Sequence, residues 1–203
     1  MNFEKLIIPM AIGIVLLVIA LVIGGAVIAS YNGVIGQDVS IKKMKSELDS
    51  QYQRRADLIP NLVSTVQASA QFEKSTQTEI AGLRSRAITG QEKMKSAQSV
   101  SEMNEANGEL SSVLSRLMVV VEAYPDLKSN QNFRDLTSQL EGTENRITYA
   151  RSEYNEAVQN YETSVRSFPM SMFAGMFGFN PDKWKMFEAE KGTNVAPVVT
   201  FNI

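Results

Sequence analysis

A long run without charge near the amino terminus constrains this chain of 203 residues more than any other feature. Residues 6–35 contain no Asp, Glu, Lys or Arg, and their apolar block of about 24 residues would span roughly 36 Å as a helix. The hydrocarbon core of a bilayer is about 30 Å thick and needs about 20 such residues. The run therefore predicts a transmembrane helix, so that the lipid bilayer is the first expected partner.

A cleaved signal peptide is the alternative interpretation, because residues 27–29 resemble a cleavage site. The apolar run is longer than the usual signal-peptide core of about 7–15 residues, and the basic Lys5 before it is offset by Glu4. We therefore expect an uncleaved anchor. Cationic side chains favour the cytoplasmic side of a membrane. Those that follow the run predict an outside amino terminus and a cytoplasmic remainder: Lys42, Lys43, Lys45, Arg54 and Arg55.

Small residues within the run bear on self-association and on bending. Ala20 and Gly24 are four positions apart, as are Gly25 and Ala29, and this spacing lets two membrane helices approach closely. Gly and Ala are also common in membrane helices without any such role. The helix could continue through residues 33–36, or the glycines there could form a hinge.

The polar remainder has the apolar periodicity of helices, with steps of three, four or seven residues in stretches that begin at Met44, Val100 and Phe133. Pro60 predicts a kink or break near residues 58–59, and Gly90 predicts a helix end. Ser99 and Glu102 have the spacing of a capping box. Later stops are predicted by prolines at 125 and 169, and polar connectors are expected at 89–98 and 126–132.

These patterns predict an all-α fold, in which an N-terminal transmembrane helix is followed by an up-and-down antiparallel bundle of long helices. The expected organisation is a short flank (1–5), a transmembrane helix (6–35), a cytoplasmic helical bundle (36–180) and a C-terminal tail (181–203).

Composition excludes several kinds of site. The chain has 0 Cys and 0 His, which removes disulfides, thiolate zinc sites and the common nucleophile–histidine systems. The formal net charge of −2 gives no basic excess that would indicate nucleic acid. No phosphate-binding glycine motif is present. We expect no enzyme activity and no cofactor, although a hydrolase that uses only carboxylates is not excluded by composition.

Several ordered segments resemble the LemA family, a group of membrane-anchored bacterial helical-bundle proteins. They are QRRADLIPNLV at 53–63, VEAYPDLK at 121–128, LEGTENRI at 140–147, and YNEAV at 154–158 followed by RSFP at 166–169. The resemblance covers nearly the whole chain, with the poorest match around 89–103. It implies a single-pass protein of the bacterial inner membrane with a helical-bundle domain, and it carries over no catalytic residues.

Charged residues within these motifs are candidates for a structural polar network rather than a metal centre. Carboxylates on facing helices can hold two metal ions, but the known bundle sites also use histidine, which this chain lacks. Arg54 and Asp57 are three residues apart and could pair. Gly142 is expected to permit close helix approach. The candidate network comprises Arg54, Asp57, Glu122, Glu141, Glu144 and Arg146.

The segment 168–179 is uncharged and rich in Met and Phe, and the tail 195–203 has the pattern of an extended strand. We interpret the segment first as a bundle cap, second as a subunit contact and third as a membrane contact. Membrane contact ranks last because the third of three helical stretches should end far from the bilayer. The candidate contact residues are Phe168, Met172, Phe173, Met176, Phe177, Phe179, Val198 and Phe201.

Together these features favour a non-catalytic, self-associating scaffold at the bacterial inner membrane. A membrane-anchored adaptor or signalling module that binds a protein partner through its bundle is the alternative. An enzyme with a carboxylate site is the third hypothesis.

Overall fold

Helices form every regular element in the residues that the computed structural model describes, which are 4–69 and 72–187. The elements are α1 (Glu4–Ser69), α2 (Lys74–Ser96), α3 (Val100–Glu122), α4 (Pro125–Ser129), α5 (Gln131–Arg166), α6 (Met170–Phe173) and the 3-10 helix η1 (Pro181–Lys183). The prediction of an all-α fold with a long apolar first helix and long antiparallel helices is confirmed. The tail predicted as an extended strand, at 195–203, lies outside the described residues.

Helix α1 is continuous over 66 residues, through Gly33, Gly36 and Pro60. The structure thus has the continuous helix and not a hinge at the glycines. Of the kink or break predicted near residues 58–59, the break is wrong. Proline costs about 3 kcal/mol inside a helix, but burying an aliphatic side chain is worth about 1.5–3 kcal/mol. The turns around Pro60 bury several of them, namely Ile59, Leu62, Val63 and Val66.

The prediction of three long helical stretches after the anchor is also wrong, because the structure has one more helix and so one more chain reversal. The stretch that begins at Met44 is divided, because α1 ends at Ser69 and α2 begins at Lys74. Gly90 does not end a helix, since α2 continues to Ser96 and covers most of the connector expected at 89–98. The second expected connector contains the short helix α4. The capping box at Ser99 is confirmed.

The helices form two packed units, both of which include part of α1 and part of α5. We call residues 4–50 with 152–184 the anchor unit, and residues 51–69, 72–151 and 185–187 the bundle unit. In the bundle unit, α2 and α3 are antiparallel, because Lys93 pairs with Glu109 while Glu79 pairs with Arg116. Its core is made of aliphatic and aromatic side chains from α1 to α5, among them Tyr52, Ile59, Leu83, Leu110, Leu127 and Ile147.

Close helix approach in the bundle unit occurs at Gly90 and not at Gly142. A Cβ built on Gly90 would lie 3.0 Å from the side chain of Leu110, whereas one on Gly142 would meet nothing within 4 Å. The expectation for Gly142 is therefore wrong. Gly90 permits the contact between α2 and α3 because it has no side chain.

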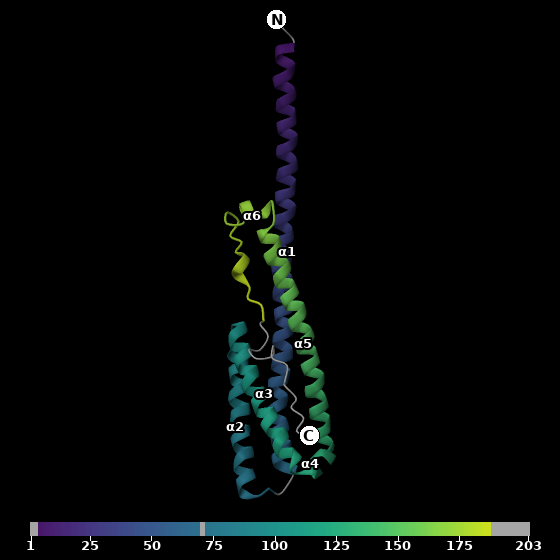
Figure 1. Ribbon diagram of the computed structural model, residues 1–203, viewed down its shortest axis with the longest axis vertical. Coiled ribbons are helices and arrows are strands. Elements are labelled where there is room, and N and C mark those ends of the chain that lie inside the picture. The colour runs from purple at the N-terminus through teal and green to yellow at the C-terminus, as the bar shows by residue number, and fades with distance from the viewer. Residues whose placement is uncertain (1–3, 70–71, 188–203) are drawn as a thin grey trace, which may run out of the picture. The chain divides into compact units, whose positions relative to one another are not determined.

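The anchor unit combines a bare apolar helix with a packed helix pair. Residues 10–26 of α1 are exposed, and an 18-residue window of the helix reaches a mean hydropathy of 3.0 with none of it buried. By length and composition, α1 could cross a membrane. Further along, α1 buries Val34, Ile41 and Leu48. Figure 1 shows the carboxyl-terminal end of α5, and then α6, beside this part of α1.

Candidate functional site

The most unusual surface of the anchor unit is the segment 168–179, which we call the aromatic–methionine segment. It returns to α1 through Tyr31, whose ring centroid lies 5.1 Å from that of Phe177 and 5.4 Å from that of Phe179. Only part of the segment is covered, with Met170 and Ala174 buried. The exposed fractions are 75% for Phe168, 71% for Met172 and 76% for Met176.

The position of this segment contradicts the expectation that the last long helix ends far from the apolar run. Tyr31 lies within the uncharged run 6–35, so the end of α5 and the segment after it return to the helix that could cross the membrane. The physical reason is the additional reversal between α1 and α2. Segment residues do partly cap the helix pair, since Met170 is buried, but most of the apolar surface faces outward.

A polar clamp holds the chain after this segment against α1. The carboxylate of Asp38 accepts hydrogen bonds from Lys183 Nζ at 2.6 Å and from Trp184 Nε1 at 3.0 Å, and it pairs with Lys42 Nζ at 2.8 Å. The Asp38 side chain is 13% exposed. Burial alone would raise its pKa, but the hydrogen bonds from Lys183, Lys42 and Trp184 outweigh burial and lower the pKa from 3.8 to about 2.

Tyr161 reinforces the clamp from α5. Its hydroxyl donates a hydrogen bond to the carbonyl oxygen of Asn180 at 3.2 Å, and the Asn180 side chain accepts one from the backbone N–H of Asp182. Burial, and then the nearby negative charge of Asp38, raise the pKa of Tyr161. The phenol therefore remains a neutral donor at physiological pH.

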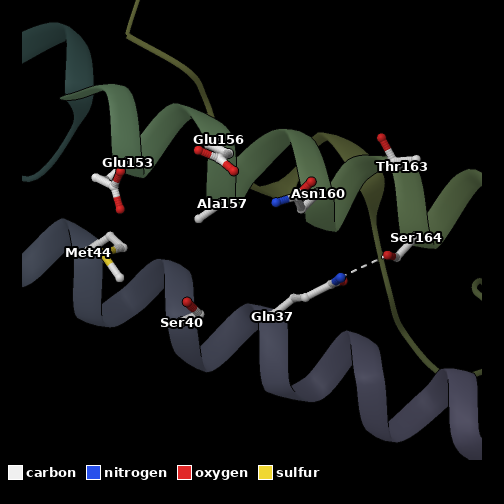
Figure 2. Close-up of a pocket in the computed structure, with 9 residues that line it drawn as sticks. All are labelled: Gln37, Ser40, Met44, Glu153, Glu156, Ala157, Asn160, Thr163 and Ser164. Atoms are coloured by element: carbon white, nitrogen blue, oxygen red, sulfur yellow. Dashed lines mark hydrogen bonds between the residues drawn. The ribbon is translucent and has the colours of Figure 1, made fainter. Parts of the chain in front are cut away.

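A polar groove of about 350 Å³ lies between α1 and α5 in the anchor unit (Figure 2). Gln37 Nε2 donates a hydrogen bond to Ser164 Oγ at 2.9 Å across the groove. The Oε1 atom of Gln37 is buried and has no protein partner among the described residues. The remaining lining residues are Ser40, Met44, Glu153, Glu156, Ala157, Asn160 and Thr163. Its amides, hydroxyls and carboxylates could bind water or a polar group there.

The bundle unit buries a cation, Arg55, which is 7% exposed. Its guanidinium pairs with Glu144 of α5, and it donates hydrogen bonds to Asn107 Oδ1 at 3.0 Å and to Ser111 Oγ at 3.1 Å on α3. Arg55 therefore connects α1, α3 and α5. It also lines a cavity of about 290 Å³ with Leu114, Met118, Thr137, Leu140, Glu141 and Glu144.

A second cation in the bundle unit binds a tyrosine. Arg151 lies over the Tyr52 ring, 5.4 Å from its centroid, donates a hydrogen bond to the Tyr52 hydroxyl and donates another to Asn104 at 3.2 Å. Burial raises the pKa of Tyr52, and the charge of Arg151 opposes that effect. This contact joins α1, α3 and α5 a second time.

The structure brings together only Glu141 and Glu144 among the predicted network residues, both at the cavity beside Arg55. Asp57 accepts hydrogen bonds from Gln53 and Gln91, and Glu122 pairs with Lys128 at the surface. Arg54 and Arg146 are exposed. No group of three acidic side chains suited to a metal ion occurs within 4–69 and 72–187. Of the predicted contact residues, Val198 and Phe201 lie outside the described ranges.

Sequence reasoning missed Arg55 and Asp38, although one signal for Arg55 was present. Arg55 is three residues after Tyr52 and four before Ile59, which places it on the apolar face of α1, whereas Arg54 is one position out of phase. For Asp38 the sequence signals only Lys42, four residues later, because its other partners, Lys183 and Trp184, are distant in sequence.

Comparison with known proteins gives one family and three distant relatives. A model of the LemA family matches residues 44–201. Magnetosome proteins MamQ 1 and MamQ 2 of Paramagnetospirillum magneticum are each 23% identical over 189 residues, which cover 84% of this chain and 68% of each relative. Magnetosome protein MamQ of Magnetospirillum gryphiswaldense is 22% identical over 189 residues, which cover the same fractions of this chain and of the relative.

Proposed function

Since the chain belongs to the LemA family, we propose that this membrane-associated helical protein is a non-catalytic scaffold that self-associates at the bacterial inner membrane. The observation that carries the proposal is the continuity of α1. One unbroken helix has an exposed apolar stretch and then buries Val34, Ile41 and Leu48 in the anchor unit. A helix without a hinge transmits the position and tilt of a membrane anchor to the helices packed on it, which is the property that a scaffold requires.

Self-association is assigned to the apolar stretch of α1. A Cβ added to Gly24 or Gly25 would meet nothing within 4 Å, so these positions are open to a neighbouring helix. Ala20 and Ala29 complete two pairs of small residues at four-residue spacing. In lipid, helix association depends on close van der Waals packing, which such pairs permit.

The test replaces both glycines, as Gly24→Leu with Gly25→Leu, in the full-length chain. Gly13→Leu is the matched control, because Gly13 is equally open but is flanked at four residues by Pro9 and Leu17. Cross-linking in native membranes and mass measurement in nanodiscs should show loss of the assembly only in the double variant. An assembly of unchanged size in both variants, or a monomer in the unaltered protein, would overturn the proposal.

The non-catalytic part of the proposal is supported by the lack of His and Cys in the sequence, which removes the commonest catalytic bases and nucleophiles. The proposed topology has the amino terminus outside and the remainder in the cytoplasm. Asn2→Cys and Val100→Cys test it, because the natural chain has no cysteine to react with a membrane-impermeant label in intact cells.

A protein-binding adaptor is the second candidate, favoured by the cavity beside Arg55. Leu114, Met118 and Leu140 give this cavity an apolar wall, and Val119 on the same helix α3 is 61% exposed. Placing a photo-cross-linking amino acid at Met118 distinguishes the two functions. A heterologous protein captured at this site in living cells would favour the adaptor, and capture of this chain alone would favour the scaffold.

A further inference from the structure

We propose that the aromatic–methionine segment is a second membrane contact, inserted in the interface of the bilayer that holds α1. This inference rests on the membrane anchoring in the proposed function, but not on self-association. The occupant is a lipid surface rather than a second protein.

The position of the segment along α1 carries the inference. The uncharged run 6–35 is longer than the roughly 20 residues needed for the hydrocarbon core, so its end extends into the headgroup layer. Tyr31 lies near that end, and tyrosine is favoured at this depth, where its ring is apolar and its hydroxyl is hydrated. The segment contacts this same ring through Phe177 and Phe179. Its apolar surface is therefore continuous with the end of the membrane-spanning surface.

The chemistry of the segment suits the interface. No charged side chain occurs between Arg166 and Asp182. Its three most exposed apolar side chains are Phe168, Met172 and Met176, each more than 70% exposed. Apolar side chains that bind at the membrane–water interface are buried about 5–10 Å into the boundary between headgroups and acyl chains. Water would otherwise contact this whole patch.

The clamp on Asp38 gives the segment a fixed orientation. Lys183 and Trp184, which follow the segment, are hydrogen-bonded to α1 seven residues after Tyr31. Arg166 before the segment pairs with Asp182 after it, so both ends are tied. A preorganised loop loses little conformational entropy on insertion. Two contacts with one bilayer, the span and the segment, would limit rotation and tilt of the anchor unit.

The test uses nitroxide labels at single cysteines in the full-length chain, reconstituted in phosphatidylcholine–phosphatidylglycerol nanodiscs. Labels at Met172→Cys and Met176→Cys should collide more with oxygen than with a water-soluble nickel complex, and this ratio should exceed that of Val119→Cys severalfold. Val119 is the control because it is an apolar side chain with similar exposure on α3. Adding Met176→Asp to the Met172→Cys chain should lower the ratio towards that of the control.

A label at Leu16→Cys separates the two proposals. If the label at residue 16 is in lipid and the labels at 172 and 176 are in water, the inference fails while the anchor stands. If all three are in water, anchoring itself fails. Strong coupling between labels at residue 176 of different chains, with low access to oxygen, would identify a subunit contact and would also overturn the inference.

Discussion

The anchor unit holds the partly buried carboxylate of Asp38, the bundle unit holds the buried guanidinium of Arg55, and the two units use these opposite charges differently. In the anchor unit, the carboxylate of Asp38 is surrounded by Lys42, Lys183 and Trp184, of which Lys42 and Lys183 remain about half exposed. In the bundle unit, the guanidinium of Arg55 is surrounded by acceptors on two other helices. The first closes a short segment onto one helix, and the second joins three helices.

This difference separates a polar contact that determines how three helices pack, at Arg55, from one that only holds a short segment on a helix, at Asp38. An ion that loses its partner costs little when water can replace that partner, and much when the remaining group is enclosed. Around Asp38 the two lysines can turn to solvent. Around Arg55 the amide of Asn107 is buried and cannot. The bundle unit should therefore depend on its buried charge more strongly than the anchor unit does.

The largest effect is expected for Arg55→Met, which keeps the length of the side chain and removes the charge. The loss leaves Asn107 without its charged donor, and we expect the free energy of unfolding to fall by about 2–3 kcal/mol. Arg54→Met is the matched control, since Arg54 is exposed, and it should change the free energy by less than about 0.5 kcal/mol. Urea unfolding in detergent micelles, followed by circular dichroism, measures both. Equal losses of stability in Arg55→Met and Arg54→Met would show that the buried charge is not what stabilises the bundle unit.

Asp38→Asn should have a smaller effect, about 1–2 kcal/mol after allowance for solvent screening. The amide keeps the shape of the side chain but does not attract Lys42 and Lys183 as strongly. Trp184 is the only tryptophan in the sequence, so its fluorescence reports this contact directly. A red shift of Trp184 emission without loss of helix content is expected. Cooperative unfolding of the bundle unit instead would show that the clamp is not local.

The pH dependence follows from the lowered pKa of Asp38. Its pKa is about 2 in the folded protein and about 3.8 when unfolded, so folding favours the ionised form. The stabilisation is complete above about pH 4 and is lost as the pH falls towards 2. Trp184 emission should change across this interval, and the change should be absent in Asp38→Asn. Identical titrations of the two proteins would assign the transition to another carboxyl group.

The smallest effects are expected for two glycine substitutions in the bundle unit, which measure helix propensity without changing any polar contact. Gly142→Ala should raise the free energy of unfolding by about 0.5–1 kcal/mol, because the added Cβ has open space and the helix gains propensity. Gly90→Ala should gain less or lose stability, since its Cβ would lie 3.0 Å from Leu110. Thermal unfolding of both variants tests the pair. A larger gain at Gly90 would contradict the close approach.

The sequence was most informative where a local property determines structure. Absence of charge over 6–35 predicted the apolar helix, and the spacing of Ser99 and Glu102 predicted the start of α3. It was misleading between the end of α1 and the start of α2, where residues 68–73 contain neither Gly nor Pro, and at Pro60, where a proline lies inside a helix. Turn residues mark reversals only when packing does not override them.

The amino-acid sequence by itself determined that this protein is helical, that one helix could span a membrane, and that sites built on His or Cys are excluded. Composition and short-range periodicity decide these properties. The tertiary structure decided that Asp38 binds Lys183 and Trp184, and that residues 168–179 return to Tyr31. These contacts join residues more than a hundred positions apart or depend on the number of chain reversals. No local pattern encodes either quantity.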